Sequence, residues 1–319
     1  MSLTINHQTD DISNLTGITT FNGVAVGGDN RVWYGDRGLF GGGEGQADKT
    51  DTVNYINIAN TGNATDFGNL IANTRELAGC SSGTRGLFGG GYTSSSIGVI
   101  QYVTIATTGN SADFGDLTVI RKALAACSSV TRGLFGGGYA SSNSNVIDYV
   151  TIATTGNAQD FGDLTVARRA LVACADGTSG LFAGGLSLTD TIDYVTIATT
   201  GNAQDFGNLS VAKELVAACA NRTRGLFAGG WSSPNFYDTI DYVTVATPGN
   251  ATDFGDLTVA RSGAAGASNG VRGVFGGGFG GTWGTANIID YVNMDTTGNA
   301  TDFGDLTENF YTLAAFSGT

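Results

Sequence analysis

One stretch of the sequence decides the fold: residues 132–164, which read RGLFGGGYASSNSNVIDYVTIATTGNAQDFGDL. An apolar pair, Leu134 and Phe135, comes early and is followed by three glycines. From Tyr149 apolar and polar residues alternate, with many β-branched side chains, and this two-residue period predicts a strand. The stretch then passes a Gly-Asn turn and reaches Asp160-Phe161-Gly162.

The same pattern recurs six times at a spacing of about 47 residues, which indicates one structural unit per copy. The phenylalanine of the apolar pair marks the copies at Phe40, Phe88, Phe135, Phe182, Phe227 and Phe275. In the third copy we expect four extended segments, at Ala123–Ser128, Gly133–Gly137, Ile147–Thr154 and Asp160–Ala167. Four strands in a repeat of this length are typical of one blade of a β-propeller.

The two ends of the repeat region complement each other. Leu313–Thr319 resembles the segment that begins at Leu77, but it lacks the Arg-Gly-Leu-Phe continuation, which Arg37 begins at the other end of the repeats. Because a propeller that does not close leaves unpaired sheet edges, we expect residues 311–319 to complete the first blade. The sequence therefore predicts an all-β, six-bladed propeller of four-stranded blades over residues 37–319, preceded by an extended tail of residues 1–36.

The repeat resembles the kelch repeat. The features that carry this resemblance are glycines at the end of a strand, a tyrosine that opens the next one, an aromatic residue in the fourth strand and an arginine after it, here Gly136-Gly137-Gly138, Tyr149, Phe161 and Arg168. Kelch blades usually have tryptophan where this chain has phenylalanine, as at Phe161. The resemblance implies a kelch-like propeller.

Composition restricts the classes of protein. The chain has 51 glycines in 319 residues but only two prolines and no G-X-Y period, which excludes a collagen-like rod. Its net charge of −13 disfavours nucleic acid and anionic lipid as partners, and a hydrophobic content of 41% is enough for a core. Neither a membrane-spanning stretch nor a secretory signal is found, so membrane insertion is not expected.

Residues 1–36 lie outside the repeats and alternate short strand-forming stretches with polar intervals. They are similar to the N-terminal attachment regions of bacteriophage tail fibres and other virion proteins, and the near-identical blades are similar to those of phage structural proteins. The resemblance implies a protein made in the host cytoplasm and located in the virion. It also implies contact with other virion proteins through the tail, and a homo-oligomer in the particle.

Catalytic constellations are not found. His7 is the only histidine and precedes the repeats, so no catalytic site and no metal or cofactor site is predicted. Four cysteines, Cys80, Cys127, Cys174 and Cys219, occupy one position in successive repeats, which is too far apart for disulfides and favours buried, reduced thiols. The aspartates also recur in register, so we expect them in turns and in pairs with the arginines Arg85, Arg132, Arg224 and Arg272.

The repeats differ most in the segment between the second and third strands, and variable loops on a regular scaffold are where binding sites lie. Aromatic residues occur there among Ser, Asn and Gly, a combination suited to stacking on sugar rings. These candidate ligand-binding residues are Trp231, Phe236, Tyr237, Phe279 and Trp283. Trp231 and Phe279, like Tyr92 and Tyr139, directly follow the glycines, and packing between blades is the alternative for them.

We therefore expect a non-enzymatic virion protein, a tail fibre or surface appendage, whose propeller loops touch a host-surface glycan or a neighbouring subunit. A free multivalent lectin is the alternative, in which several weak sites act together through avidity.

Overall fold

The computed structural model describes residues 20–21, 24–25, 35–45, 48–186, 189–281 and 284–318. The chain divides into two units, Met1–Arg31 and Val32–Thr319. In the first unit, β1 (Thr20–Phe21) pairs antiparallel with β2 (Val24–Ala25). The attachment role that we expect for residues 1–36 falls mostly outside the described residues, and it stays a prediction.

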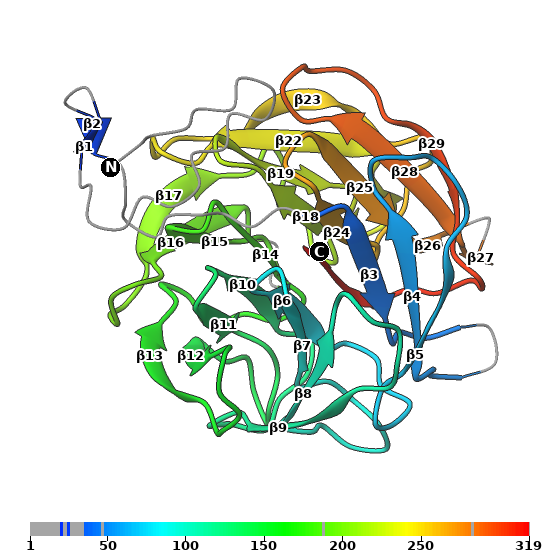
Figure 1. Cartoon of the computed structure of the whole chain (residues 1–319). Helices are drawn as coiled ribbons and strands as arrows, with labels where there is room; N and C mark the ends of the chain where they lie inside the picture. The colour runs from blue at the N-terminus through cyan, green and yellow to red at the C-terminus, as the bar shows by residue number, and fades with distance from the viewer. Residues whose placement is uncertain are drawn as a thin grey trace. The chain divides into compact units, whose positions relative to one another are not determined.

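The second unit is a ring of six four-stranded sheets, which confirms the predicted propeller (Figure 1). Blades 1 to 3 consist of β30 (Ala314–Gly318), β3 (Arg37–Gly41), β4 (Thr52–Asn57) and β5 (Thr65–Asn69); of β6 (Ala78–Ser81), β7 (Arg85–Gly89), β8 (Val99–Thr104) and β9 (Ala112–Asp116); and of β10 (Ala125–Ser128), β11 (Arg132–Gly136), β12 (Val146–Thr151) and β13 (Gln159–Asp163).

Blades 4 to 6 follow the same order from the inner to the outer strand. They consist of β14 (Val172–Ala175), β15 (Ser179–Ala183), β16 (Thr191–Thr196) and β17 (Gln204–Asn208); of β18 (Ala217–Ala220), β19 (Arg224–Ala228), β22 (Thr239–Thr244) and β23 (Thr252–Asp256); and of β24 (Ala265–Ser268), β25 (Arg272–Gly276), β28 (Ile288–Asn293) and β29 (Thr301–Asp305). Two short hairpins extend from the ring, β20 (Trp231–Ser232) with β21 (Asn235–Phe236), and β26 (Phe279–Gly280) with β27 (Gly284–Thr285).

The C-terminal strand closes the ring as predicted. β30 pairs antiparallel with β3, and in this register Phe316 lies opposite Leu39 and Ala315 opposite Phe40. Blade 1 is thus built from both ends of the unit, and β30 covers the edge of β3 that would otherwise lack a partner strand. The described residues include no helix long and apolar enough to cross a membrane.

The hydrophobic core lies between neighbouring blades, where the two faces of adjacent sheets meet. Phe182 of blade 4, for example, is fully buried and packs against Gly136 of blade 3. A Cβ atom on Gly136 would lie 2.6 Å from this ring, so the glycine at this position in blades 1, 2, 3 and 6 makes room for the phenylalanine of the next blade. Blades 4 and 5 have Ala183 and Ala228 there. The repeated Leu-Phe-Gly motif is therefore a packing motif between blades.

Buried ion pairs also join the blades, and here one expectation is wrong. Asp148 of β12 pairs with Arg121, which precedes blade 3, at 3.0 Å, rather than with Arg85. The corresponding pairs are Arg168–Asp193, Lys213–Asp241 and Arg261–Asp290, at 2.8 to 3.1 Å. All eight side chains are almost completely buried, so each charge needs its partner.

The arginines that were expected to bind these aspartates instead stack on tyrosines and hold the next blade. Arg132 lies 4.7 Å from the ring of Tyr149 and donates hydrogen bonds to the carbonyl oxygens of Ile197 and Ala198 in blade 4. Equivalent stacks place guanidinium groups over tyrosine rings at 4.5 to 4.9 Å, for Arg37 with Tyr55, Arg85 with Tyr102, Arg224 with Tyr242 and Arg272 with Tyr291. The expectation was wrong because each arginine begins the second strand, three residues before the position that faces the aspartate: Arg132 is paired with Thr151, whereas Phe135 is paired with Asp148.

The four cysteines are free, buried thiols on the inner strands, at one register position, as predicted. Burial raises the pKa of the Cys80 thiol to about 12, which keeps it protonated at neutral pH. Such thiols act as small apolar side chains beside the central channel.

Candidate functional site

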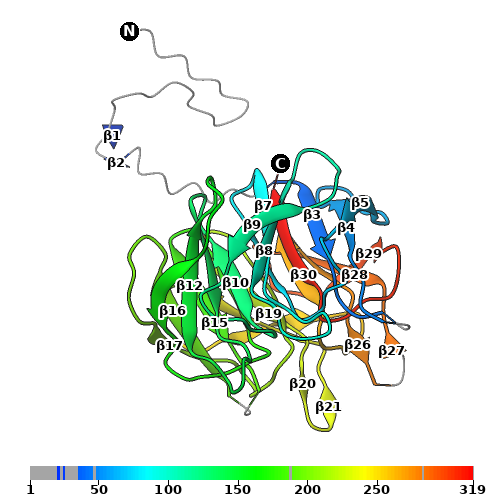
Figure 2. The same cartoon turned by 90° about the horizontal axis from the view of Figure 1, so that it is seen from below.

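The connections between the second and third strands all lie on one side of the ring, which we call the hairpin face. They begin at Gly42, Gly90, Gly137, Gly184, Gly229 and Gly277. Figure 2 shows both short hairpins, β20–β21 and β26–β27, projecting from this face, whereas the C-terminal end of β30 lies at the opposite one. The variable segments of the sequence are thus gathered on a single surface.

Paired glycines bring each connection close to the loop that enters the next blade. Gly90 has a φ of +62°, and a Cβ atom there would lie 2.7 Å from the carbonyl oxygen of Arg121. Only glycine tolerates both the left-handed backbone and this approach. The residue after the glycines, such as Tyr92, then forms an antiparallel bridge with the loop on its other side, here with Arg75.

Three of the predicted ligand-binding residues lie in or beside an aromatic cluster on blades 5 and 6. Trp231 and Phe236 are cross-strand partners in β20–β21. The ring of Phe236 packs on that of Phe279 with centroids 5.8 Å apart, and Phe279 packs on Tyr311 at 5.7 Å. All four side chains are half-buried, so they remain reachable from solvent.

The other two candidates are placed differently. Tyr237 lies at the base of the blade 5 hairpin, where the Lys213 ammonium group is 5.8 Å from its ring centroid. Because that ammonium group belongs to the buried pair with Asp241, Tyr237 is close to the contact between blades 4 and 5. Trp283 lies outside the described residues.

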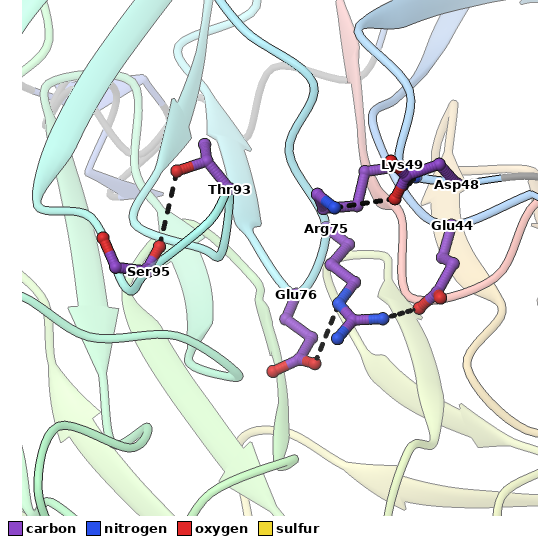
Figure 3. Close-up of polar contacts among 7 residues, drawn as sticks. All are labelled: Glu44, Asp48, Lys49, Arg75, Glu76, Thr93 and Ser95. Atoms are coloured by element: carbon purple, nitrogen blue, oxygen red, sulfur yellow. Dashed lines mark hydrogen bonds and ion pairs between the residues drawn. The ribbon is translucent and has the colours of Figure 1, made fainter.

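A charged cluster occupies the hairpin face over blades 1 to 3. The Arg75 guanidinium group is hydrogen-bonded to Glu44, and its Nε lies 3.5 Å from the Glu76 carboxylate (Figure 3). Lys122 approaches Glu76 from the next blade at 3.1 Å, and both cations lie over the ring of Tyr92, Arg75 at 5.1 Å and Lys122 at 4.6 Å. Carboxylates, cations and an aromatic ring thus form one connected network.

Tyr311 connects the two clusters, because its ring packs on Phe279 and its hydroxyl group is hydrogen-bonded to Glu44. Burial, together with that hydrogen bond and the negative charge of Glu44, raises the pKa of Tyr311 to about 12. The hydroxyl group therefore remains a neutral donor at physiological pH. Side-chain contacts run without a break from blade 6 through blade 1 to blade 3.

The mouth of the central channel opens at the centre of the hairpin face. Its wall consists mainly of alanine, leucine and glycine, with Glu76 as its single ionisable residue among those described. A closed ring of six backbone hydrogen bonds surrounds it, and we call this ring the collar. The N–H groups of residues 76, 123, 170, 215, 263 and 312 each donate to the equivalent carbonyl oxygen of the preceding blade, at 2.7 to 3.0 Å.

The hairpin face brings together aromatic rings, charged groups and apolar side chains. The sequence predicted its aromatic hairpins but not the part played by Glu44, which follows the glycines of blade 1, or by the entering-loop residues Arg75, Glu76, Lys122 and Tyr311. The available signal was that these positions differ among repeats that are otherwise nearly identical. Within the described ranges, no three His, Cys, Asp or Glu side chains are grouped to hold a metal ion.

Comparison with known proteins adds no family assignment: no protein-family model matches the chain, and no curated protein is significantly similar to it.

Proposed function

We propose that the protein is a non-enzymatic structural protein of a bacteriophage virion, a tail fibre or surface appendage, that presents its hairpin face to a host-surface glycan or a neighbouring subunit. The observation that carries the binding role is the contrast between the repeated and the singular parts of the ring. The packing between blades repeats around the ring with few substitutions, whereas two-stranded aromatic hairpins occur only in blades 5 and 6 among the described residues.

The virion assignment is supported by the resemblance of residues 1–36 and of the near-identical blades to phage proteins. In this proposal the tail binds other virion proteins, and the propeller is the displayed part. Half-buried aromatic rings in polar loops provide sugar-binding surfaces, because a ring covers the apolar face of a sugar while loop groups bind its hydroxyls.

The test separates attachment from display. Deletion of residues 1–30 is expected to give a soluble, folded ring that no longer enters particles, whereas Phe279→Ala is expected to assemble normally and to lose glycan or host-surface binding. Phe67→Leu, a substitution in the packing between blades, is the control for a general loss of stability. A deletion variant that still enters particles would contradict the proposed tail. A monomer that binds a glycan array without any association with particles would favour the free lectin.

A further inference from the structure

Antiparallel bridges on the hairpin face place pairs of side chains side by side. Five of these bridges join a residue of the entering loop to the residue that follows the glycines. In an antiparallel pair the two side chains point to the same side, with Cα atoms roughly 4.5–5.5 Å apart. The five bridges are Glu44↔Tyr311, Arg75↔Tyr92, Lys122↔Tyr139, Glu214↔Trp231 and Ser262↔Phe279.

Blade 2 shows how this scaffold arranges charges at such a pair. Arg75 lies over the ring of its bridge partner Tyr92 and binds the carboxylates of Glu44 and Glu76. The cation is thus held between an aromatic face and negative charge, an arrangement that favours binding because the face of the ring is also negative. Arg169, from the loop that enters blade 4, lies over Tyr139 of blade 3 at 4.5 Å, as Lys122 lies over Tyr92 of blade 2.

Blade 5 has the carboxylate and the aromatic face but not the cation. Glu214 and Trp231 exchange two backbone hydrogen bonds, at 3.0 and 2.8 Å, so their side chains are neighbours. Among the described residues none forms an ion pair with Glu214, although the charge of Arg169 reaches it. Half-burial beside a negative ring face makes this carboxylate a group that a cation would stabilise.

We propose that Glu214 and Trp231 form a binding site for an ammonium or guanidinium group of an external partner. The carboxylate accepts hydrogen bonds from the cation while the indole ring stacks on it, which reproduces the surroundings of Arg75. Two sources supply this chemistry: a lysine or arginine side chain of a protein, or the free amine of an amino sugar. The net charge of −13 attracts either one to the surface. The inference deepens the proposed binding role of the hairpin face and rests on it.

The experiment uses the full chain with Trp33→Phe and Trp283→Phe, so that Trp231 is the remaining tryptophan of three. Its fluorescence is titrated at low salt with N-acetylarginine amide, glucosamine and N-acetylglucosamine. We expect saturable changes with the first two probes only, and the stronger of the two identifies the source of the cation. Glu214→Gln is expected to weaken binding about tenfold through loss of a charge-assisted hydrogen bond. Trp231→Leu, followed by calorimetry, is expected to abolish it.

The matched control is Glu308→Gln, which removes the same charge from an exposed position of the hairpin face and is expected to leave the affinity unchanged. Equal binding of N-acetylglucosamine, or equal affinity in the Glu214→Gln variant, would overturn the cation site. So would the absence of any binding by the Trp33→Phe, Trp283→Phe variant, once circular dichroism has shown that it is folded. The proposed display role is measured separately, by particle incorporation and host-surface binding, so the two proposals fail independently.

Discussion

At the scale of single residues, the six contacts between blades can be compared directly, because different residues occupy the same two buried positions. Four contacts pair a buried cation with a buried aspartate, as Arg121 does with Asp148. At the other two, the cation and the acid are replaced together: Thr74 occurs with Gln101, and Phe310 with Asn54. The chain therefore never leaves one buried charge at this position without its partner, as the cost of desolvation requires.

This pairing predicts the effect of exchanging one contact for another. Arg121→Phe leaves Asp148 buried and uncompensated, and it is expected to lower the free energy of unfolding by about 3–5 kcal/mol. The double variant Arg121→Phe with Asp148→Asn reproduces the Phe310–Asn54 contact, and Thr118 can still donate to the amide oxygen as Thr307 does to Asn54. Most of the loss is expected to be recovered in urea unfolding. A double variant as unstable as the single one would contradict the role of charge compensation.

The contribution of Glu214 to the stability of the fold depends on pH, and the direction of its pKa shift gives the sign. Burial raises its pKa above the ordinary value of 4.5, against the opposing charge of Arg169. A carboxyl group whose pKa is raised by folding stabilises the fold fully below pH 4.5, and this contribution is lost as pH rises through the folded-state pKa. Glu214→Gln is therefore expected to raise the melting temperature at pH 7 and to have no effect near pH 3. Glu308→Gln, at an exposed position, is the control, and a difference independent of pH would contradict the assignment.

At the scale of elements, the positions of the strands followed from the sequence because a period-two pattern repeated six times averages out local exceptions. The predicted ends of the strands were less accurate than their positions. In blade 3 the third strand was expected to reach Thr154 but ends at Thr151, where the turn bond from the Thr154 N–H to the Thr151 carbonyl oxygen begins. The fourth was expected to reach Ala167 but ends at Asp163, because the chain then turns to place Thr165 on Asp193.

The candidate site was predictable only in part, for a related reason. Aromatic residues in variable loops indicate a binding surface, and this identified the hairpins that contain Trp231 and Phe279. The bridges that set Glu214 beside Trp231 depend on contacts between a loop and the following hairpin. Sequence spacing does not determine these contacts, just as it did not determine which arginine reaches Asp148.

The collar is the element with the most backbone strain. Five of its six positions have a positive φ without being glycine, at 52–56°, and the sixth is Gly263. A left-handed conformation costs a residue with a Cβ atom about 1–2 kcal/mol. Ala123→Gly and Ala170→Gly are therefore each expected to stabilise the ring by about 1 kcal/mol, measured by urea unfolding. Ala125→Gly in the extended strand β10 is the control and is expected to destabilise it. Destabilisation by all three would show that the collar stores no strain.

At the scale of the whole ring, the six contacts between blades are not equally strong. Three kinds of bond recur outside the core: the buried ion or amide pair, the arginine that reaches the next blade, and a serine hydroxyl of the inner strand that donates to the blade before, as Ser128 does to Ser81. The contact between blades 4 and 5 has Ser179 and Ala220 in place of the arginine and the serine. Its ion pair uses Lys213, and Asp241 accepts no hydrogen bond from the described residues.

We therefore expect the ring to open first between β14–β17 and the blade of β18, and not at the closure of β30 with β3. In hydrogen exchange, the collar amide of Leu215, which bridges blades 4 and 5, should exchange faster than that of Ala123, which bridges blades 2 and 3 with a similar bond length of 2.9 against 2.8 Å. Ser179→Arg with Ala220→Ser should slow exchange at Leu215. The new arginine can donate to the carbonyl oxygens of Val245 and Ala246 in blade 5, as Arg132 does to those of Ile197 and Ala198 in blade 4, and the new serine can donate to the Ala175 carbonyl oxygen, as Ser128 does to that of Ser81. Faster exchange in β30 than in β18 would show instead that the two ends of the unit separate first, because local opening follows the weakest set of contacts.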